Sequence, residues 1–286
     1  MKEKILKRIF TLPALLFIFL SADAKVSTYV GSTPAHEVTR IFLQISLTDS
    51  IDFIRWKLEI DSGTFKLEYR YGLAKPGTPG FSNEQGETID GKLIKTKNHY
   101  LLKRNDKQIS LLRINENILH FIDRNNRLLI GNGGYSYALN NMHPVNSDAF
   151  NSGSVKTAIN SPLVFEGRTP CRKLSSLLGL NKSEACNKMK WYIILYTDPV
   201  TRKASYFLMG GMKYRKETMT RGTWDIVTSN GRIIYRLKCD KWIRSLNLLK
   251  ADNNILLFID GNGQPLVGNG DFSYTLNRRS QEYPRK

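Results

Sequence analysis

The chain contains one stretch of sequence twice, and this repetition constrains the fold more than any other feature. Residues 111–140 and residues 248–277 align without a gap, and roughly half of their positions are identical. Self-similarity at a fixed offset is the mark of repeated structural units. The sequence therefore predicts two tandem copies of one domain.

Each copy of this stretch has the pattern of a β-hairpin. In the first copy an apolar run over 117–122 enters a polar turn that begins at Asp123, and the second copy turns at Asp260. The Asp-x-Asn start of both turns also suggests a calcium loop. The glycine at position six and the glutamate at position twelve that such a loop needs are missing from both copies. A turn is therefore the better interpretation.

A Gly-Asn-Gly break follows each hairpin and leads into a final strand. The strand residues at 135, 137 and 139 are Tyr, Tyr and Leu, and their equivalents at 272, 274 and 276 are Phe, Tyr and Leu. This period-two alternation predicts a strand with one face on a core, so each copy ends in a β-meander. Upstream, the Trp of RWKLEI matches the Trp of KWYIILY. The positions that define the repeat signature are Trp56, Asp123, Gly131, Asn132 and Tyr137 in the first copy and Trp191, Asp260, Gly268, Asn269 and Tyr274 in the second.

A helix is expected near the start of each copy. Thr33-Pro34 and Thr169-Pro170 precede apolar residues at helical spacing, with Thr as the expected N-cap and Pro at the first helical position. Gly179 is the expected C-cap of the second helix. The apolar residues are Val38, Ile41, Phe42 and Ile45 in the first copy and Leu174, Leu177 and Leu178 in the second.

These elements predict a mainly β protein. One short N-terminal helix and about half a dozen antiparallel strands in each copy suggest a small curled sheet or barrel. The first copy is expected over residues 25–140 and the second over 162–286. Residues 141–161 are rich in Asn, Ser, Gly and Pro and are expected to form a linker.

The first 24 residues have the three regions of a cleavable signal peptide. A basic region precedes the apolar run 9–20, and the small-residue site Ala22-Asp23-Ala24 precedes Lys25. The apolar run is shorter than the roughly 20 residues that a spanning helix needs. No cysteine lies at the cleavage site for lipid attachment. We expect export to the periplasm, the cell envelope or the extracellular space.

The three cysteines, Cys171, Cys186 and Cys239, favour one disulfide in an exported chain. The first copy lacks equivalents of both Cys171 and Cys186, and two cysteines that are missing together are expected to bond to each other. Cys239 is then the odd thiol, and its role is open. The alternative is a reactive Cys171, because a cysteine in the first turn of a helix has a lowered pKa.

Catalytic and metal motifs are nearly absent from the sequence. GxSxG, HExxH and phosphate-binding loop patterns are missing, and the four histidines lack ligand spacing. We expect no enzymatic activity and no obligatory cofactor. Copper(I) is an alternative, because thioethers and thiolates suit it and Met209, Met212 and Cys171 lie in one copy. Against it, residues three apart in a strand face opposite ways.

Positive charge is the strongest compositional indication of function. The formal net charge is +18, and removal of the signal, with its four basic and two acidic residues, leaves +16. Such a surface attracts polyanions. Because export separates the protein from nucleic acid, anionic lipid headgroups and anionic envelope polymers are the expected partners. A basic but inert surface is the open alternative.

Short motifs occur in the same order in the two copies. The second copy carries GRTPC, KWYIILY, GTW and FSYTLN, and the first carries GSTPA, RWKLEI and GYSYALN. This arrangement resembles the N-terminal domain of the NlpE family of copper-resistance proteins. The resemblance implies a lipocalin-like barrel in the bacterial envelope and a role in copper tolerance or envelope-stress signalling, with a signalling partner. Of the family's closely spaced cysteines, the chain matches the position of Cys171 alone. The sequence thus predicts an exported, non-enzymatic binding or stress-sensing module, with copper binding through soft ligands of the second copy as the alternative.

Overall fold

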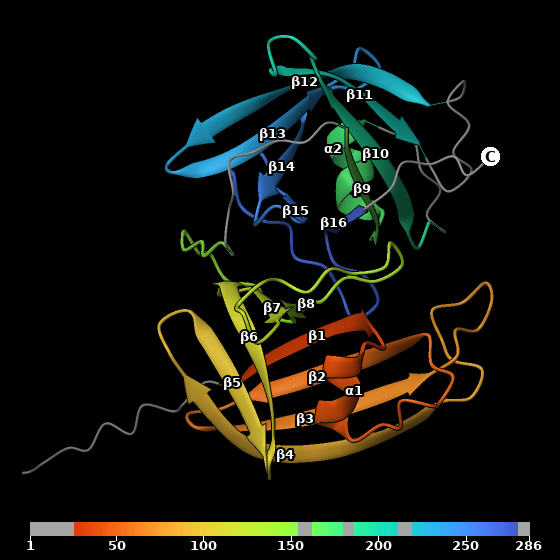
Figure 1. The fold of residues 1–286 in the computed structure, drawn as a ribbon, viewed down its shortest axis with the longest axis vertical. Helices are drawn as coiled ribbons and strands as arrows, with labels where there is room; N and C mark the ends of the chain where they lie inside the picture. The colour runs from red at the N-terminus through yellow and green to blue at the C-terminus, as the bar shows by residue number, and fades with distance from the viewer. Residues whose placement is uncertain (1–25, 154–161, 180–185, 211–218, 280–286) are drawn as a thin grey trace, which may run out of the picture.

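Two closed barrels of eight antiparallel strands follow each other along the chain (Figure 1). The computed structural model describes residues 26–153, 162–179, 186–210 and 219–279. Each strand pairs with the next one in sequence, and the last strand of each barrel closes on the first. The predicted fold class, mainly β with two tandem antiparallel barrels and one short helix in each, is confirmed.

The elements of the two barrels correspond one to one. The first barrel comprises β1 (Ser27–Pro34), α1 (Glu37–Leu43), β2 (Phe53–Ile60), β3 (Thr64–Gly72), β4 (Gln85–Lys95), β5 (His99–Arg104), β6 (Lys107–Asn115), β7 (Ile118–Ile122) and β8 (Ala138–Asn141). The second comprises β9 (Leu163–Thr169), α2 (Arg172–Leu178), β10 (Met189–Thr197), β11 (Ala204–Gly210), β12 (Thr220–Ser229), β13 (Arg232–Lys238), β14 (Leu246–Lys250), β15 (Ile255–Phe258) and β16 (Thr275–Arg279).

Alternation along the strands builds the barrel interiors. In β2, Trp56, Leu58 and Ile60 are buried in the core of the first barrel, and the charged residues Lys57 and Glu59 lie between them. The interior of an eight-stranded barrel is just wide enough for side chains to fill. One contiguous cluster of buried apolar side chains lies within each barrel, so each copy has a core of its own.

The helix of each copy follows the first strand and does not precede it. The expectation that Thr-Pro pairs begin these helices is wrong, because Thr33 and Thr169 belong to β1 and β9, which stay paired through these positions. The buried hydroxyl groups of Thr33 and Thr169 each accept a hydrogen bond from a Trp indole N–H. The N-caps are His36, whose side chain accepts a hydrogen bond from the Val38 N–H, and Cys171.

Each of the two short helices packs against its barrel through one face only. Gly179 is the C-cap of α2, with a left-handed φ of 67°, and Leu174 and Leu178 are buried against the barrel core. In α1, Phe42 is buried in the same way. Helical spacing places Ile41 on the apolar face of α1, and this prediction is wrong: its neighbour Phe42 takes the inward direction and Ile41 is 41% exposed.

The linker between the barrels is attached to both of them in its described part. The Asn151 N–H donates to the Ile114 carbonyl of the first barrel, and the Gly153 N–H donates to the Ala251 carbonyl of the second. The predicted signal peptide lies outside the described residues. Among the helices that the structure describes, none has the length and apolar character needed to cross a bilayer.

Candidate functional site

The two barrels meet along an apolar cluster that is separate from both barrel interiors and that we call the inter-barrel seam. The short strands β7 and β15 form its centre, because one face of each lies in its own barrel and the other in the seam. Figure 1 shows these strands at the junction of the barrels. The seam cluster contains Leu112, Ile114, Ile118, Ile122, Leu128 and Ala138 from the first barrel and Leu249, Ala251, Ile255, Leu257 and Ile259 from the second.

Reciprocal hydrogen bonds border the seam. The Asn140 side-chain oxygen accepts a hydrogen bond from the Gly268 N–H at 2.8 Å, and the Asn277 oxygen accepts one from the Gly131 N–H at 2.7 Å. Asn140 and Asn277 are equivalent residues of the repeat, and so are Gly131 and Gly268. Equivalent groups thus exchange equivalent bonds, as in the self-complementary interface of a two-fold dimer.

Equivalent residues also contact each other directly at the centre of this arrangement. The hydroxyls of Ser136 and Ser273 lie 2.6 Å apart and are buried. The rings of Tyr135 and Phe272 are nearly parallel, with centroids 6.1 Å apart. Phe53 extends the stack into the first barrel, at 4.6 Å from Tyr135. The barrels therefore contact each other about a pseudo-two-fold axis through polar and aromatic pairs as well as through the apolar cluster.

The signature glycines are required by backbone packing in their loops. A Cβ at Gly131 would lie 2.1 Å from the Tyr135 carbonyl oxygen, and one at Gly268 would lie 2.3 Å from that of Phe272. Real Cβ atoms do not approach backbone so closely, so only glycine fits. These two positions place the N–H groups that bond across the seam.

The other signature residues shape turns and barrel interiors. Asp123 and Asp260 each accept hydrogen bonds from backbone N–H groups two and four positions later, as expected for turns. Asn132 and Asn269 accept them from N–H groups two and three positions later. Each of these four side chains therefore closes its own loop.

The signature aromatic residues lie in the two cores. Trp56 donates its indole N–H to the Thr33 hydroxyl at 2.8 Å, and Trp191 donates to Thr169 at the same distance. Tyr137 and Tyr274, a fifth equivalent pair of the signature, are buried in the first and second barrel cores. These four residues stabilise the interiors of their own barrels.

His120 is the one position of β7 that breaks the apolar character of the seam. Its side chain is fully buried, and its equivalent in the second barrel is Leu257. Nδ1 lies 2.9 Å from the Phe121 carbonyl oxygen, while Nε2 has no hydrogen-bond partner among the described residues. Burial lowers the pKa of His120 to about 4. The imidazole is therefore neutral at physiological pH.

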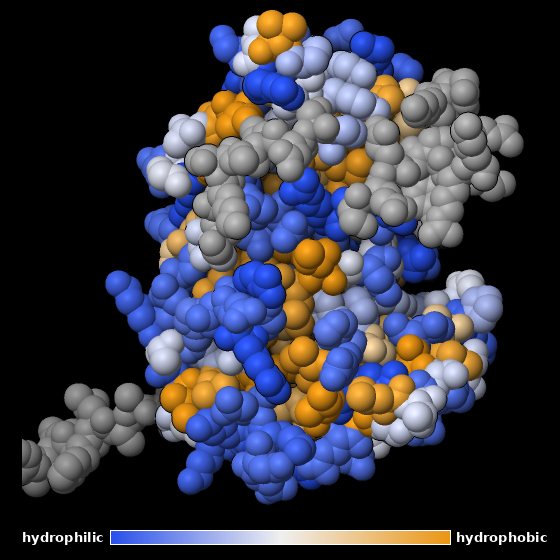
Figure 2. Space-filling view, viewed as in Figure 1, coloured by the Kyte–Doolittle hydropathy of each residue, from blue (hydrophilic) through white to orange (hydrophobic). Residues whose placement is uncertain are grey.

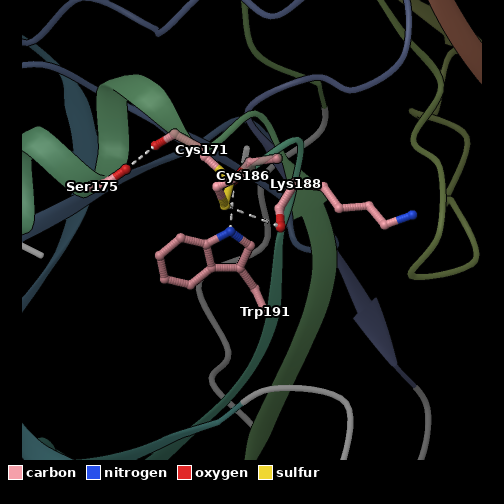
Figure 3. The surroundings of a disulfide bond; sticks show 6 residues. Cys171, Ser175, Cys186, Lys188 and Trp191 are labelled. Atoms are coloured by element: carbon pink, nitrogen blue, oxygen red, sulfur yellow. Dashed lines mark hydrogen bonds between the residues drawn. A yellow bond between two sulfur atoms is a disulfide. The ribbon is translucent and has the colours of Figure 1, made fainter. Parts of the chain in front are cut away.

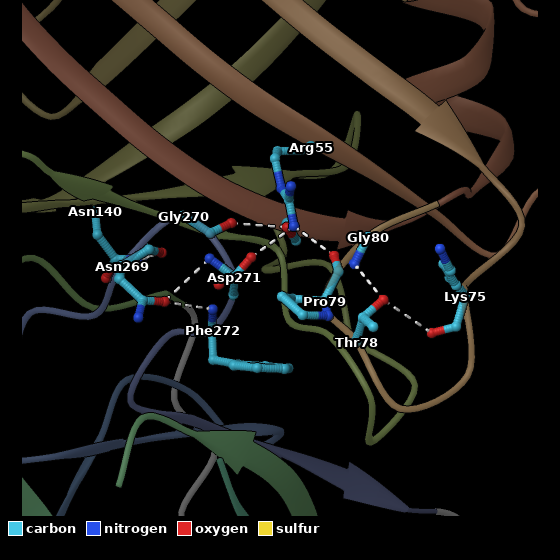
Figure 4. Close-up of polar contacts among 11 residues, drawn as sticks. Arg55, Lys75, Thr78, Pro79, Gly80, Asn140, Asn269, Gly270, Asp271 and Phe272 are labelled. Atoms are coloured by element: carbon cyan, nitrogen blue, oxygen red, sulfur yellow. Dashed lines mark hydrogen bonds and ion pairs between the residues drawn. The ribbon is translucent and has the colours of Figure 1, made fainter. Parts of the chain in front are cut away.

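Two clefts flank the seam, and they are equivalent under the pseudo-two-fold axis. The first has a volume of about 240 Å³. Every cation lining it has a carboxylate partner: Arg55 pairs with Asp271 at 2.5 Å across the barrels, and Lys57 and Arg70 both pair with Glu68. Figure 4 shows Arg55 reaching from the first barrel to the loop of Asp271. The charges of this cleft are balanced.

The second cleft, of about 220 Å³, is more basic. Its lining includes one described carboxylate, Glu166, which pairs with Arg279 at 2.5 Å. Arg168 and Lys190 also line it and lie directly opposite each other on the paired strands β9 and β10. Burial, and next the charges of Arg168 and Lys190, lower the pKa of the neighbouring Lys188. The described lining of this cleft therefore contains three cations, Arg168, Lys190 and Arg279, and one carboxylate.

The Cys171–Cys186 disulfide is confirmed, with the Cα atoms 6.0 Å apart. It joins the N-cap of α2 to the segment before β10, beside Trp191 (Figure 3). Cys239 is the free cysteine, as expected, and packs against the core of the second barrel.

The disulfide removes the Cys171 thiolate from the predicted copper ligands. Met209 packs against the core of the second barrel, and Met212 lies outside the described residues. Within the described ranges, no cluster of three His, Cys, Asp or Glu side chains is placed to hold a metal ion. Of the three predicted ligands, the structure describes two: Cys171, which is in the disulfide, and Met209, which packs against the core.

Comparison with protein-family models, with curated proteins and with solved structures gave no match. Function is therefore inferred from the residues of this chain.

Sequence reasoning missed the seam and the clefts. A signal for the seam was present, since ILLFI is an unbroken apolar run and ILHFI is interrupted by His120 alone, and such runs indicate strands buried on both faces. The shared Ser136 and Asn140 positions were a second signal, because polar residues retained in both copies of a diverged repeat have a common task. The clefts gave no local signal, because their cations come from separate strands.

Proposed function

We propose that this protein is an exported, non-enzymatic binding module that recognises anionic polymers or anionic lipid headgroups of the cell envelope through its second barrel. The observation that carries the proposal is the unequal charge of two barrels with one fold. Residues 163–279 contain 20 Lys and Arg and 9 Asp and Glu, a net charge of +11. Residues 27–141 contain 15 and 12, a net charge of +3. Since the first barrel forms the same fold with little net charge, folding does not explain the excess in the second.

The distribution of the basic side chains supports binding at a surface. Arg172, Lys203, Arg221, Lys238 and Lys241 are all exposed and come from different parts of the second barrel. Figure 2 shows hydrophilic residues over much of the visible face, with smaller apolar groups between them. A potential that many dispersed charges create attracts an extended polyanion better than a small neutral ligand.

The packed barrel interiors also favour recognition at the outside. Buried aromatic and aliphatic side chains occupy the centre of each barrel, including Trp56 and Phe121 in the first and Trp191 and Phe258 in the second. A ligand carried inside would have to displace this core. Binding at the surface and in the clefts requires no such rearrangement.

The NlpE-like arrangement of motifs adds envelope-stress sensing as the biological setting of this proposal, with a signalling partner that responds to the bound state. The copper alternative has less support, because the Cys171 sulfur is bonded to Cys186 and disulfide sulfur is not the thiolate that copper(I) prefers.

The test compares two triple variants that remove equal charge from opposite barrels. One carries Arg172→Gln, Lys203→Gln and Lys241→Gln, and its matched control carries Lys66→Gln, Lys97→Gln and Lys103→Gln, all at exposed positions. Binding to vesicles that contain an anionic lipid, or to an anionic cell-wall polymer, is measured over a range of salt concentrations.

We expect the second-barrel variant to bind at least about tenfold more weakly than the control at low salt. Binding by the unmodified protein should fall steeply with salt, because exposed charges are screened within about 10 Å at 0.1 M. Equal losses in both variants, or no binding at low salt, would overturn the proposal.

A further inference from the structure

The loop between β13 and β14 has no counterpart in the first barrel. The equivalent strands β5 and β6 are joined by a tight turn of the polar residues Asn105 and Asp106. In the second barrel, β13 ends at Lys238 and β14 begins at Leu246, so residues 239–245 form a longer connection that we call the β13–β14 loop. Its sequence, CDKWIRS, places a tryptophan and an isoleucine between charged residues. The first barrel closes without such a loop, so the fold does not require it.

The β13–β14 loop presents an isoleucine to solvent on an aromatic base. Ile243 is 77% exposed, and among the large apolar side chains that the structure describes only Val200 is more exposed. Trp242, the residue before Ile243, is partly buried. Its ring stacks on Phe207 of the barrel core with centroids 5.5 Å apart, and its backbone N–H donates to the Cys239 carbonyl. The loop is therefore attached to the core at Trp242 and holds the next side chain outward.

Helix α2 lies next to this isoleucine and adds basic side chains. A Cβ at its C-cap, Gly179, would lie 2.2 Å from Cδ1 of Ile243, so the isoleucine lies against the end of the helix. Arg172 and Lys173 are exposed in the first turn of α2, which is about 10 Å long because it has 7 residues. The sequence of α2, RKLSSLL, contains no acidic residue, whereas α1 begins with Glu37.

The charges of the loop and of α2 favour an anionic partner. The loop contains two exposed cations, Lys241 and Arg244, and one exposed carboxylate, Asp240. With the two cations of α2, the loop and the helix have four positive charges and one negative charge, a net charge of +3. Lys238, at the end of β13, is left out of this sum because it pairs with Asp225 at 3.5 Å.

An exposed apolar side chain among cations matches the chemistry of a bilayer surface. Anionic headgroups attract Lys and Arg side chains, and the acyl chains beneath them accept apolar side chains. Tryptophan is enriched at this boundary, because its ring is apolar and its N–H is polar. An anionic polymer without acyl chains would use the cations alone and would leave Ile243 in water.

We infer that the β13–β14 loop inserts Ile243 into the surface of an anionic lipid bilayer, with Lys241 and Arg244 at the headgroups and α2 beside them. The inference rests on the proposed function and deepens it, because it selects lipid as the partner and identifies the end of the second barrel that meets the membrane.

A second exposed loop of the same barrel provides a matched control. Residues 198–203 join β10 to β11 and contain Val200, which is 86% exposed, with the cations Arg202 and Lys203 and the carboxylate Asp198. The two loops thus carry equal net charge. Because neighbouring strands are antiparallel, the loop after β10 and the loop after β13 lie at opposite ends of the barrel. The Val200 loop contains no aromatic residue, so we assign insertion to the Ile243 end.

The test measures binding of the purified protein to vesicles of phosphatidylglycerol and phosphatidylcholine, and in parallel to dextran sulfate, a polyanion without acyl chains. Ile243→Asn should weaken vesicle binding by about tenfold or more, the effect expected when one aliphatic side chain is no longer buried. It should change dextran sulfate binding by less than about twofold. Val200→Asn should change both by less than about twofold. Both residues are exposed, so neither substitution removes a core contact.

Vesicles with brominated acyl chains report insertion directly, because bromine quenches the fluorescence of a tryptophan that enters the bilayer. Trp56, Trp191 and Trp224 are at most 3% exposed and lie in the barrel cores, whereas Trp242 is partly exposed. We expect these vesicles to quench the unmodified protein. Trp242→Phe should remove most of the quenching and keep most of the vesicle binding.

The outcomes separate insertion from the proposed function. Equal losses in Ile243→Asn and Val200→Asn, or vesicle binding without quenching of Trp242, would overturn insertion and leave binding by charge alone. Binding to dextran sulfate but not to vesicles would also overturn insertion and leave the proposed function with a polymer as partner. Quenching that requires Ile243 but is equal on pure phosphatidylcholine and at high salt would support insertion and reject the proposed function. Absence of binding to vesicles and to dextran sulfate at low salt would overturn both.

Discussion

The first and second barrels share strand order, helix position and seam contacts, yet they differ in how the helix is held and in how charge is distributed. In the first barrel α1 is attached by apolar packing, and the cations beside the seam have carboxylate partners. In the second, a disulfide ties the N-cap of α2 to the barrel, and the described lining of the cleft contains three cations and one carboxylate. The fold therefore requires the seam and the cores, whereas the large excess of positive charge and the disulfide belong to the second copy alone.

This difference separates the residues that form the fold from the residues that are available for recognition. Positions that agree in the two copies, such as Gly131 with Gly268 and Asn140 with Asn277, serve the loops and the seam. Positions that disagree, such as Gly134 with Asp271, change the chemistry of the clefts while the backbone stays the same.

Removing the disulfide should have the largest effect on the stability of the second barrel. The bond closes a loop with a sequence separation of 15 residues, which is worth roughly 3 kcal/mol in the chain-entropy model. We expect Cys171→Ser with Cys186→Ser to lose about this much unfolding free energy. Urea unfolding is followed by fluorescence in a Trp56→Phe background, where the remaining tryptophans belong to the second barrel.

The control for the disulfide is Cys239→Ser, which should be nearly neutral. Non-reducing peptide mapping should show Cys171 joined to Cys186 and Cys239 as the thiol that is alkylated. A double-serine variant as stable as the unmodified protein would mean that packing alone holds α2, as it holds α1.

Acid should weaken the seam through His120, a residue that only the first barrel has. The folded pKa of about 4 lies below the ordinary value of 6.5, so the unfolded chain binds the proton first as pH falls. The contribution of neutral His120 to the free energy of unfolding is therefore fully present above about pH 6.5. It is lost as the pH falls from 6.5 to 4, and protonation of this group causes no further loss below pH 4. The difference between a pKa of 6.5 and one of about 4 corresponds to roughly 3 kcal/mol.

The control for His120 comes from the second barrel itself. His120→Leu copies Leu257 and should flatten the loss of unfolding free energy between pH 6.5 and 4, leaving only the contribution of carboxylates. Unfolding free energy measured at several pH values decides this. If both proteins lose stability equally over that range, another group is responsible.

Removing the reciprocal asparagines should weaken the seam from either side. Asn140→Ala and Asn277→Ala each leave a backbone N–H of a signature glycine without its partner, at a cost of about 1 to 2 kcal/mol. Because the two contacts are equivalent, the two losses should be similar. Urea unfolding of each variant is followed by tryptophan fluorescence. The transition of the first barrel, reported by Trp56, should begin to separate from the transition of the second barrel. Unequal losses would contradict the pseudo-two-fold symmetry.

The smallest effect is expected at the ion pair that distinguishes the clefts. The side chains of Arg55 and Asp271 are 30% and 35% exposed, and ion pairs in such positions contribute at most about 1 kcal/mol. Asp271→Asn should therefore lose about half a kcal/mol at low salt and less at high salt. Denaturation at two salt concentrations measures this. A loss of several kcal/mol would mean that the pair holds the barrels together and is more than an electrostatic difference between clefts.

The repeat made the architecture predictable, because two aligned copies with a hairpin, a Gly-Asn-Gly break and a closing strand leave few folds open. The disulfide was predictable for the same reason, since both cysteines are missing from the first copy. Local patterns failed where pairing between distant strands decides the structure. Thr33-Pro34 looks like a helix start, but pairing of β1 with β2 keeps Thr33 in a strand, where it accepts the Trp56 indole.

The candidate site was not predictable, because its residues are brought together only by barrel closure and by the packing of one barrel on the other. Arg168 and Lys190 lie 22 positions apart and become neighbours through the register of β9 and β10. Gly134 belongs to the other barrel and joins them only across the seam. Aligning the copies position by position for charge, as well as for identity, would have shown the exchange of Asp271 for Gly134.

The reciprocal contacts across the seam have a consequence for how the two copies diverge. Two separate chains with this interface would be a homodimer, in which every substitution occurs twice and each partner must be found by diffusion. A covalent tether replaces that encounter with a high effective concentration. One copy can then acquire charges that repel within its own cleft without loss of the assembly. Fusion thus allows a symmetric scaffold to carry a single asymmetric recognition site.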